Sequence, residues 1–111
     1  MKTLKKEELK KMIDGDEEFK LIDVLSKDAF EKKRIPGSVN IPVDEDFEEK
    51  IKEKYPDKDT KIVVYCASFE CHSSPKAAEK LDEMGYTEVY DYEGGIRDWE
   101  EAGYPLEGEE F

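Results

Sequence analysis

The sequence is poor in amides, histidine and cysteine. Its 111 residues include no glutamine, a single asparagine (Asn40), a single histidine (His72) and two cysteines, Cys66 and Cys71. No apolar run is long enough to span a bilayer, and the first residues lack the apolar core of a signal peptide. We therefore expect no membrane partner and a cytoplasmic location. Two cysteines in a cytoplasmic protein are more often catalytic or redox-active than structural.

Basic residues are scarce relative to acidic ones. The chain has 18 Lys and Arg against 30 Asp and Glu, which gives a formal net charge of −12. This excess of negative charge argues against nucleic acid and anionic membrane surfaces as partners. Hydrophobic residues make up 37% and charged residues 43% of the chain, so a densely charged surface must enclose one modest core. This length fits a single domain, residues 1–111.

A strand, a loop and a helix are predicted in the middle of the sequence. Residues 62–65 are a continuous run of β-forming residues, which indicates a buried parallel strand. Cys66 follows at its carboxyl end, and Ser74-Pro75 then supplies a good helix N-cap and a residue suited to the first helical position. Strand ends and helix N-termini of this kind bind anions and lower the pKa of a thiol. This placement favours a reactive Cys66 over the alternative, a cysteine that is merely buried in the core.

Helical and strand patterns alternate along the rest of the chain. Strands are expected over residues 1–4, 19–24, within 35–42, 62–65 and 88–92, and helices over residues 7–13, 27–33, 45–54, from 74 to Gly85 and from 95 to Gly103. This alternation predicts an α/β fold with a parallel sheet and helices on both faces. Trp99 and Ile96 lie one helical turn apart and are expected in the core, whereas residues 107–110 are expected to form a frayed tail.

Several short segments follow one another in a characteristic order. They are residues 21–24, 35–42, 63–66, 85–86 with 89–90, 92–96 with Trp99, and 102–106. In this order and spacing they resemble a rhodanese-like domain along nearly the whole chain. The resemblance implies a five-stranded parallel sheet with helices on both faces. It also implies a sulfurtransferase whose catalytic nucleophile, Cys66, carries sulfane sulfur as a persulfide, with no metal or organic cofactor.

The loop after Cys66 is expected to bind the sulfur donor. Its residues are Ala67, Ser68, Phe69, Glu70, Cys71 and His72. Their backbone N–H groups would hold the anionic persulfide, while their side chains, facing outward, would control access. The loop is two residues longer than in typical single-domain members, and Ser73 and Leu25 stand where relatives often have Arg. With Glu70 and no basic side chain expected nearby, polysulfide or small persulfides should load Cys66 faster than dianionic thiosulfate.

Cys71 and His72 leave alternatives open. Cys71 lies five residues after Cys66, close enough for a disulfide if the loop folds back. It is either a resolving thiol, which attacks the Cys66 persulfide and leaves a disulfide for a thiol-reducing protein, or a bystander that packs against the loop. His72 is either a solvated loop residue or a proton donor to a leaving group. Cys66, Cys71 and His72 are too few and too crowded to predict a zinc site.

Three functions are compatible with these residues. The first is a sulfurtransferase whose partners are small sulfur donors and acceptors, acting as a monomer or weak dimer. The second is a non-catalytic module that uses the fold to bind proteins, although such a module has no need of Cys66. The third is a cysteine-dependent phosphatase, which is disfavoured because His72 occupies the place of the Arg that clamps phosphate.

Asp23, near the end of a predicted strand, is expected to cap the following turn.

Overall fold

The computed structural model describes residues 2–110. Within them, a parallel sheet has the strand order β1-β5-β4-β2-β3. Its strands are β1 (Lys2–Thr3), β2 (Lys20–Asp23), β3 (Val39–Asn40), β4 (Lys61–Tyr65) and β5 (Glu88–Tyr92). The helices are α1 (Lys6–Asp14), α2 (Lys27–Lys32), α3 (Phe47–Lys54), α4 (Ser73–Glu83) and α5 (Gly95–Glu101). The predicted five-stranded parallel sheet is confirmed; only the predicted strand start at Met1 lies outside the described residues.

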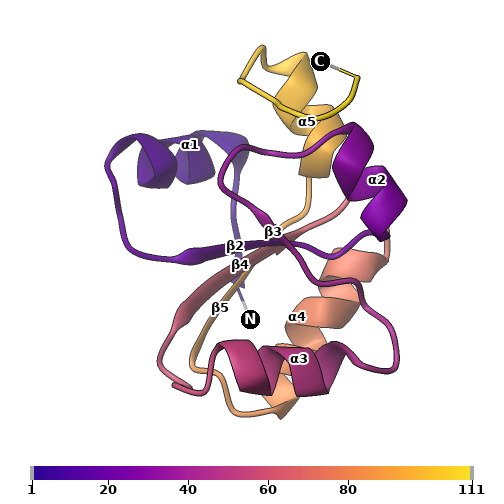
Figure 1. Cartoon of the computed structure of the whole chain (residues 1–111). Helices are drawn as coiled ribbons and strands as arrows, with labels where there is room; N and C mark the ends of the chain where they lie inside the picture. Colours follow the sequence, from indigo (N-terminus) through magenta and orange to yellow (C-terminus); the bar gives the residue numbers. More distant parts are fainter. Residues whose placement is uncertain (1, 111) are drawn as a thin grey trace.

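Helices cover both faces of the sheet, with α3 and α4 on one face and α1 and α5 on the other (Figure 1). Successive side chains of a strand point to opposite faces. Ile62 and Val64 of β4 therefore pack against α3 and α4, whereas Val63 and Tyr65 pack against α1 and α5. All four side chains are fully buried, which explains why β4 reads as a continuous apolar run. We call these two sides the α3–α4 face and the α1–α5 face.

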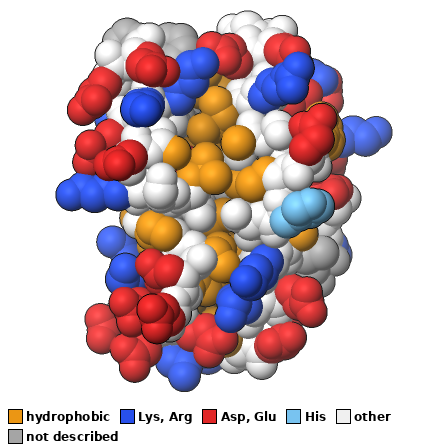
Figure 2. Space-filling model, turned by 90° about the vertical axis from the view of Figure 1, so that its right-hand side faces the viewer, with side chains coloured by type: hydrophobic (Ala, Val, Ile, Leu, Met, Phe, Trp, Pro, Cys, Tyr) orange, Lys and Arg blue, Asp and Glu red, His pale blue; other side chains and the backbone are white. Residues whose placement is uncertain are grey.

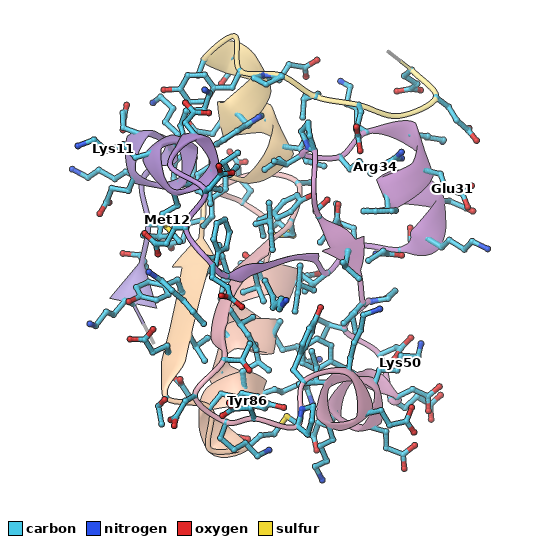
Figure 3. The ribbon with its side chains drawn as sticks, turned by 60° about the vertical axis from the view of Figure 1, so that its left-hand side comes forward. Lys11, Met12, Glu31, Arg34, Lys50 and Tyr86 are labelled. Carbon is cyan, nitrogen blue, oxygen red and sulfur yellow. A yellow bond between two sulfur atoms is a disulfide. The ribbon has the colours of Figure 1, made fainter. Side chains whose placement is uncertain are left out.

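The α1–α5 face is held by one apolar side of α1 and by aromatic packing around α5. Met12 projects from α1 toward the sheet, whereas Lys11 points away from it (Figure 3). Trp99 packs edge-on against Tyr92 and Tyr104, with ring centroids 6.0 and 4.8 Å away. Its indole N–H donates to the carbonyl of Pro105 at 2.8 Å. Trp99 is thus a core residue, as predicted.

The expectation of a frayed tail at residues 107–110 is wrong. Glu107 forms an antiparallel bridge with Arg34, with N–H to carbonyl distances of 2.8 and 3.0 Å, and their side chains form an ion pair at 3.2 Å. Figure 3 shows Arg34 and Glu31 beside this segment. The N–H groups of Glu109 and Glu110 then donate to the carbonyls of Glu31 and Lys32 in the last turn of α2. A helix end leaves such carbonyls without intrahelical partners, and the tail is ordered because it supplies them.

Charged side chains of both signs dominate the surface in Figure 2 and flank a band of apolar side chains. This is the dense surface charge that the composition requires. No helix within residues 2–110 is long and apolar enough to cross a membrane.

Candidate functional site

Cys66 lies directly after β4, the central strand of the sheet, and its side chain is fully buried on the α3–α4 face. The predicted N-cap at Ser74 is wrong by position, because α4 begins at Ser73 and His72 occupies the cap position. Ser74 lies in the first turn, fully buried, and its Oγ is 3.4 Å from the Sγ of Cys66. The local signal therefore correctly predicted a helix start, but the Ser74 hydroxyl faces Cys66 and does not cap the helix.

Cys66 and Cys71 form a disulfide, with their Cα atoms 6.4 Å apart. The loop between them folds back through a turn in which the N–H of Cys71 donates to the carbonyl of Ser68 at 3.1 Å. Cys71 is half-buried and packs against the core of the α3–α4 face. This describes the oxidised form of the pair. A reductant must open the disulfide before either sulfur can act as a nucleophile.

The side chains of the Cys66 loop, residues 67–72, face mostly outward. Those of Ala67, Phe69, Glu70 and His72 are exposed, and Phe69 is 69% exposed. A pocket of about 200 Å³ lies beside the loop. Its lining residues are Ser68, Phe69, Glu70, Gly94, Arg97, Asp98 and Glu101. The pocket thus joins the loop to α5 and does not extend to the buried Cys66.

Arg97 of α5 brings a positive charge to this pocket, contrary to the expectation that no basic side chain lies near the loop. The hydrogen bond from the Ser68 hydroxyl to Glu70, at 2.9 Å, is the main cause that lowers the pKa of Glu70, and the charge of Arg97 adds to it. The expected repulsion of dianionic donors is therefore partly offset. Arg97 was missed because it lies 27 residues from Glu70 and meets it only through the packing of α5.

The first turn of α5 also holds the backbone of the loop. The N–H groups of Ile96 and Arg97 donate to the carbonyls of Cys66 and Ala67 at 3.0 and 2.9 Å. This close approach requires a glycine at position 95, whose φ is +64°. A Cβ there would lie 2.8 Å from the backbone of both Ala67 and Ser68. Gly95 is thus needed for the approach as well as for its left-handed conformation.

Asp91 of β5 is a buried carboxyl group that the sequence analysis did not single out. It is 1% exposed and pairs in register with Val64 of β4, so its side chain lies on the α3–α4 face, as Cys66 does. Burial raises its pKa to about 6, opposed by a hydrogen bond from the Ser74 hydroxyl. Its Oδ1 has no hydrogen-bond partner. The available signal was an acidic residue between Tyr90 and Tyr92 in a predicted strand.

Asp23 of β2 is a second buried carboxyl group, on the opposite face. It lies beside Tyr65 of β4, and its Oδ1 accepts the N–H of Leu25 at 2.9 Å. This hydrogen bond confirms the predicted cap of the turn after β2. Burial raises the pKa of Asp23 to about 6. Within residues 2–110, no three His, Cys, Asp or Glu side chains lie close enough together to hold a metal ion.

Comparison with known proteins gives matches from a family model, curated sequences and solved structures. The model described as "Rhodanese-like domain" matches residues 5–102. The thiosulfate sulfurtransferase PspE of Escherichia coli (strain K12) is 38% identical over 77 residues, which cover 69% of this chain and 70% of PspE.

Two solved structures share nearly the whole fold. A thiosulfate sulfurtransferase from Pseudomonas aeruginosa matches with a TM-score of 0.85 and 27% identity, covering 97% of this chain and 20% of that one. The human single-domain sulfurtransferase TSTD1 matches with a TM-score of 0.78 and 25% identity, covering 91% of this chain and 96% of that one. The chain therefore spans a fifth of the Pseudomonas protein but nearly all of the human one.

Proposed function

The chain belongs to the rhodanese-like domain family, and from this premise we propose that it carries sulfane sulfur as a persulfide on Cys66. Relatives named as sulfurtransferases support rhodanese-type sulfurtransferase activity. The observation that carries the proposal is the position of Cys66, between the end of the central strand and the first turn of α4. We further propose that residues 1–111 act as one domain in the cytoplasm, as a monomer or weak dimer.

The first half of the reaction loads Cys66. Its thiolate attacks the outer sulfur of the donor, a new S–S bond forms, and the old bond breaks with its electron pair on the leaving group. That group is sulfite from thiosulfate, a thiolate from a small persulfide, or a shorter chain from polysulfide. Cys66–S–S⁻ remains beside the N-terminus of α4, where unpaired N–H groups stabilise an anion. The backbone of residues 67–72 is proposed to complete this site.

The second half transfers or releases the sulfur. An external thiol can take the outer sulfur of the persulfide directly. Alternatively, the Cys71 thiol attacks the inner sulfur, that of Cys66. A Cys66–Cys71 bond forms, the S–S bond of the persulfide breaks, and the outer sulfur leaves with the Cys71 proton as hydrosulfide. The disulfide between these residues supports this second route, because it is the product that a resolving thiol would leave. A thiol-reducing protein or small thiol would then supply two electrons to restore both cysteines.

The loading step is tested by weighing the intact, reduced chain after separate exposure to thiosulfate, polysulfide and a small persulfide. One bound sulfur adds about 32 Da. We expect this gain with at least one donor, and expect Cys66→Ser to abolish it while the chain stays folded. Full loading of Cys66→Ser at Cys71 would contradict the assignment. No gain with any donor would instead favour a binding module.

The resolving role is tested by Cys71→Ser. This variant should load sulfur normally, keep the persulfide and release sulfide only when an external thiol is added. The unaltered chain should release sulfide without reductant and end two hydrogens lighter than its reduced form. Equal sulfide release by both chains, with no intramolecular disulfide, would show that Cys71 is a bystander.

A further inference from the structure

The side chains of Cys66, Ser74 and Asp91 form a buried polar network between the first turn of α4 and the sheet. Ser74 is fully buried, with its Oγ 3.4 Å from the Cys66 sulfur, and its hydroxyl interacts with the carboxyl group of Asp91, whose pKa it lowers. Asp91 is itself 1% exposed and leaves Oδ1 without a partner. A buried carboxyl group with an unused oxygen is costly, because it loses hydration without full compensation. The loading mechanism described above makes no use of this group.

The hydroxyl of Ser74 has one proton, and this restricts the charges on its two neighbours. When Asp91 is ionised, Ser74 donates to the carboxylate and turns its lone pairs toward Cys66, which favours a protonated thiol. When Asp91 is protonated, it can donate to Ser74, and the Ser74 proton is then free to stabilise an anionic sulfur. Negative charges on Asp91 and Cys66 at the same time would repel each other, because a like charge nearby disfavours ionisation.

We propose that Asp91 and Cys66 share one proton through the Ser74 hydroxyl, so that Asp91 is protonated while Cys66 carries a thiolate or persulfide anion. On ionisation the Cys66 proton passes to Ser74 Oγ, and the Ser74 proton passes to Asp91. No electrons are exchanged, and the pair keeps one negative charge. The inference rests on the proposed function only for the persulfide; the thiolate needs no sulfur donor.

Among the described residues, the groups that shift the pKa of Asp91 carry no positive charge. Burial and the negative charge of Glu93 raise its pKa to about 6, and the hydrogen bond from Ser74 opposes them. From β1, Thr3 pairs with Asp91 in register and the Leu4 N–H donates to its backbone carbonyl. From β4, the paired residue is apolar Val64. Asp91 is thus a positioning residue that acts on Cys66 through Ser74.

The test uses reduced chains carrying Cys71→Ser, so that Cys66 is the only thiol. The rate of alkylation by iodoacetamide is measured from pH 5.5 to 9.5, with and without Asp91→Asn. We expect two rises in the parent, because coupled groups titrate in two steps, and one rise in Asp91→Asn. At pH 6.5 the asparagine variant should react about tenfold faster, since no carboxylate opposes the thiolate.

Two further variants locate the coupling. In a Ser74→Ala background, Asp91→Asn should have little effect on alkylation. Asp23→Asn, which alters the buried carboxyl group on the other face, should leave the alkylation profile of the parent unchanged. If Asp91→Asn has the same effect on alkylation with and without Ser74, the proposal of a shared proton is wrong. A single rise of the alkylation rate with pH in the parent would also contradict it. That second measurement needs no variant of Asp91, so it remains decisive even if Asp91→Asn misfolds.

An infrared difference spectrum provides an independent readout. Loading Cys66 with polysulfide should produce a protonated-carboxyl band in the parent that is missing in Asp91→Asn. A persulfide without this band would contradict the proposal. The outcomes are separable: normal alkylation coupling without sulfur loading would overturn the proposed function alone, whereas loading without coupling would overturn the shared proton alone.

Discussion

Asp23 and Asp91 are buried at the carboxyl-terminal parts of β2 and β5, on opposite faces of one sheet. Burial raises the pKa of each to about 6. Asp23 uses its carboxylate to accept the Leu25 N–H and close a turn. Asp91 instead meets Ser74, which contacts the Cys66 sulfur. The same burial therefore has different consequences: a raised carboxyl pKa does not by itself indicate chemistry, and the neighbouring groups decide its role.

The two faces divide the work in the same way. The α3–α4 face holds Cys66, Cys71, Ser74 and Asp91. The α1–α5 face packs around Trp99 and holds the loop backbone through hydrogen bonds from the first turn of α5. We therefore expect changes on the α3–α4 face to alter the reacting sulfur. Changes on the α1–α5 face should act through support of the loop or through charge at the pocket.

The largest effect is expected at Gly95, where the supporting face meets the loop. Gly95→Ala places a Cβ against the backbone of Ala67 and Ser68, and should cost on the order of 3 kcal/mol of stability and abolish most sulfur loading. Gly103→Ala is the matched control, with a similar φ of +78° but open space around the new Cβ. It should cost only about 1–2 kcal/mol. Urea unfolding and mass measurements compare the two; equal losses would show that the loop contact is unimportant.

The next effect concerns the two carboxyl groups and pH. Because each folded-state pKa lies near 6 and the unfolded value near 4, the folded state binds more protons between these limits. Each group therefore stabilises the fold below about pH 4, and this stability, about 3 kcal/mol per group, is lost as the pH rises through 6. Asp23→Asn and Asp91→Asn should each flatten the decline.

Urea unfolding at pH 4, 5, 6 and 7 measures this decline. A slope unchanged by both substitutions would show that neither carboxyl group titrates near pH 6. We expect both variants to flatten the decline of stability with pH, and only Asp91→Asn to change the reactivity of Cys66. A change in that reactivity in Asp23→Asn as well would contradict the distinction between the two carboxyl groups.

The sequence predicts the elements of this fold better than the contacts between them. The apolar run at β4 and the β-forming residues Val89 and Tyr90 at β5 are local signals, and both strands lie where these signals place them. The N-cap of α4 was placed two residues too late, at Ser74 instead of His72, because Ser74-Pro75 is a strong local cap signal. Whether a serine closes a helix end or is buried against a sulfur is decided by the sheet beneath it, which no local pattern encodes.

The contacts missed in the sequence join residues far apart in the chain. Arg97 approaches Glu70 through α5, Asp91 meets Ser74 because α4 packs on β5, and Glu107 pairs with Arg34. Cys66 could be selected because a strand end, a loop and a helix start are consecutive in the sequence. A proton partner on another strand has no such signature, and the acidic tail looks like a solvated segment until the end of α2 is known.

The smallest effect is expected from Arg97 and Glu70, whose opposite charges lie at the pocket beside the loop. Arg97→Gln should slow loading by dianionic thiosulfate about threefold at low salt, and Glu70→Gln should speed it by a similar factor, because exposed charges interact weakly. Both effects should fade at high ionic strength. Lys11→Gln makes the same charge change on α1, where the side chain points away from the sheet (Figure 3). If Lys11→Gln slows loading by thiosulfate as much as Arg97→Gln does, the net charge of the protein, and not the charge at the pocket, sets the rate with this donor. In that case α5 supports the loop but does not select the donor.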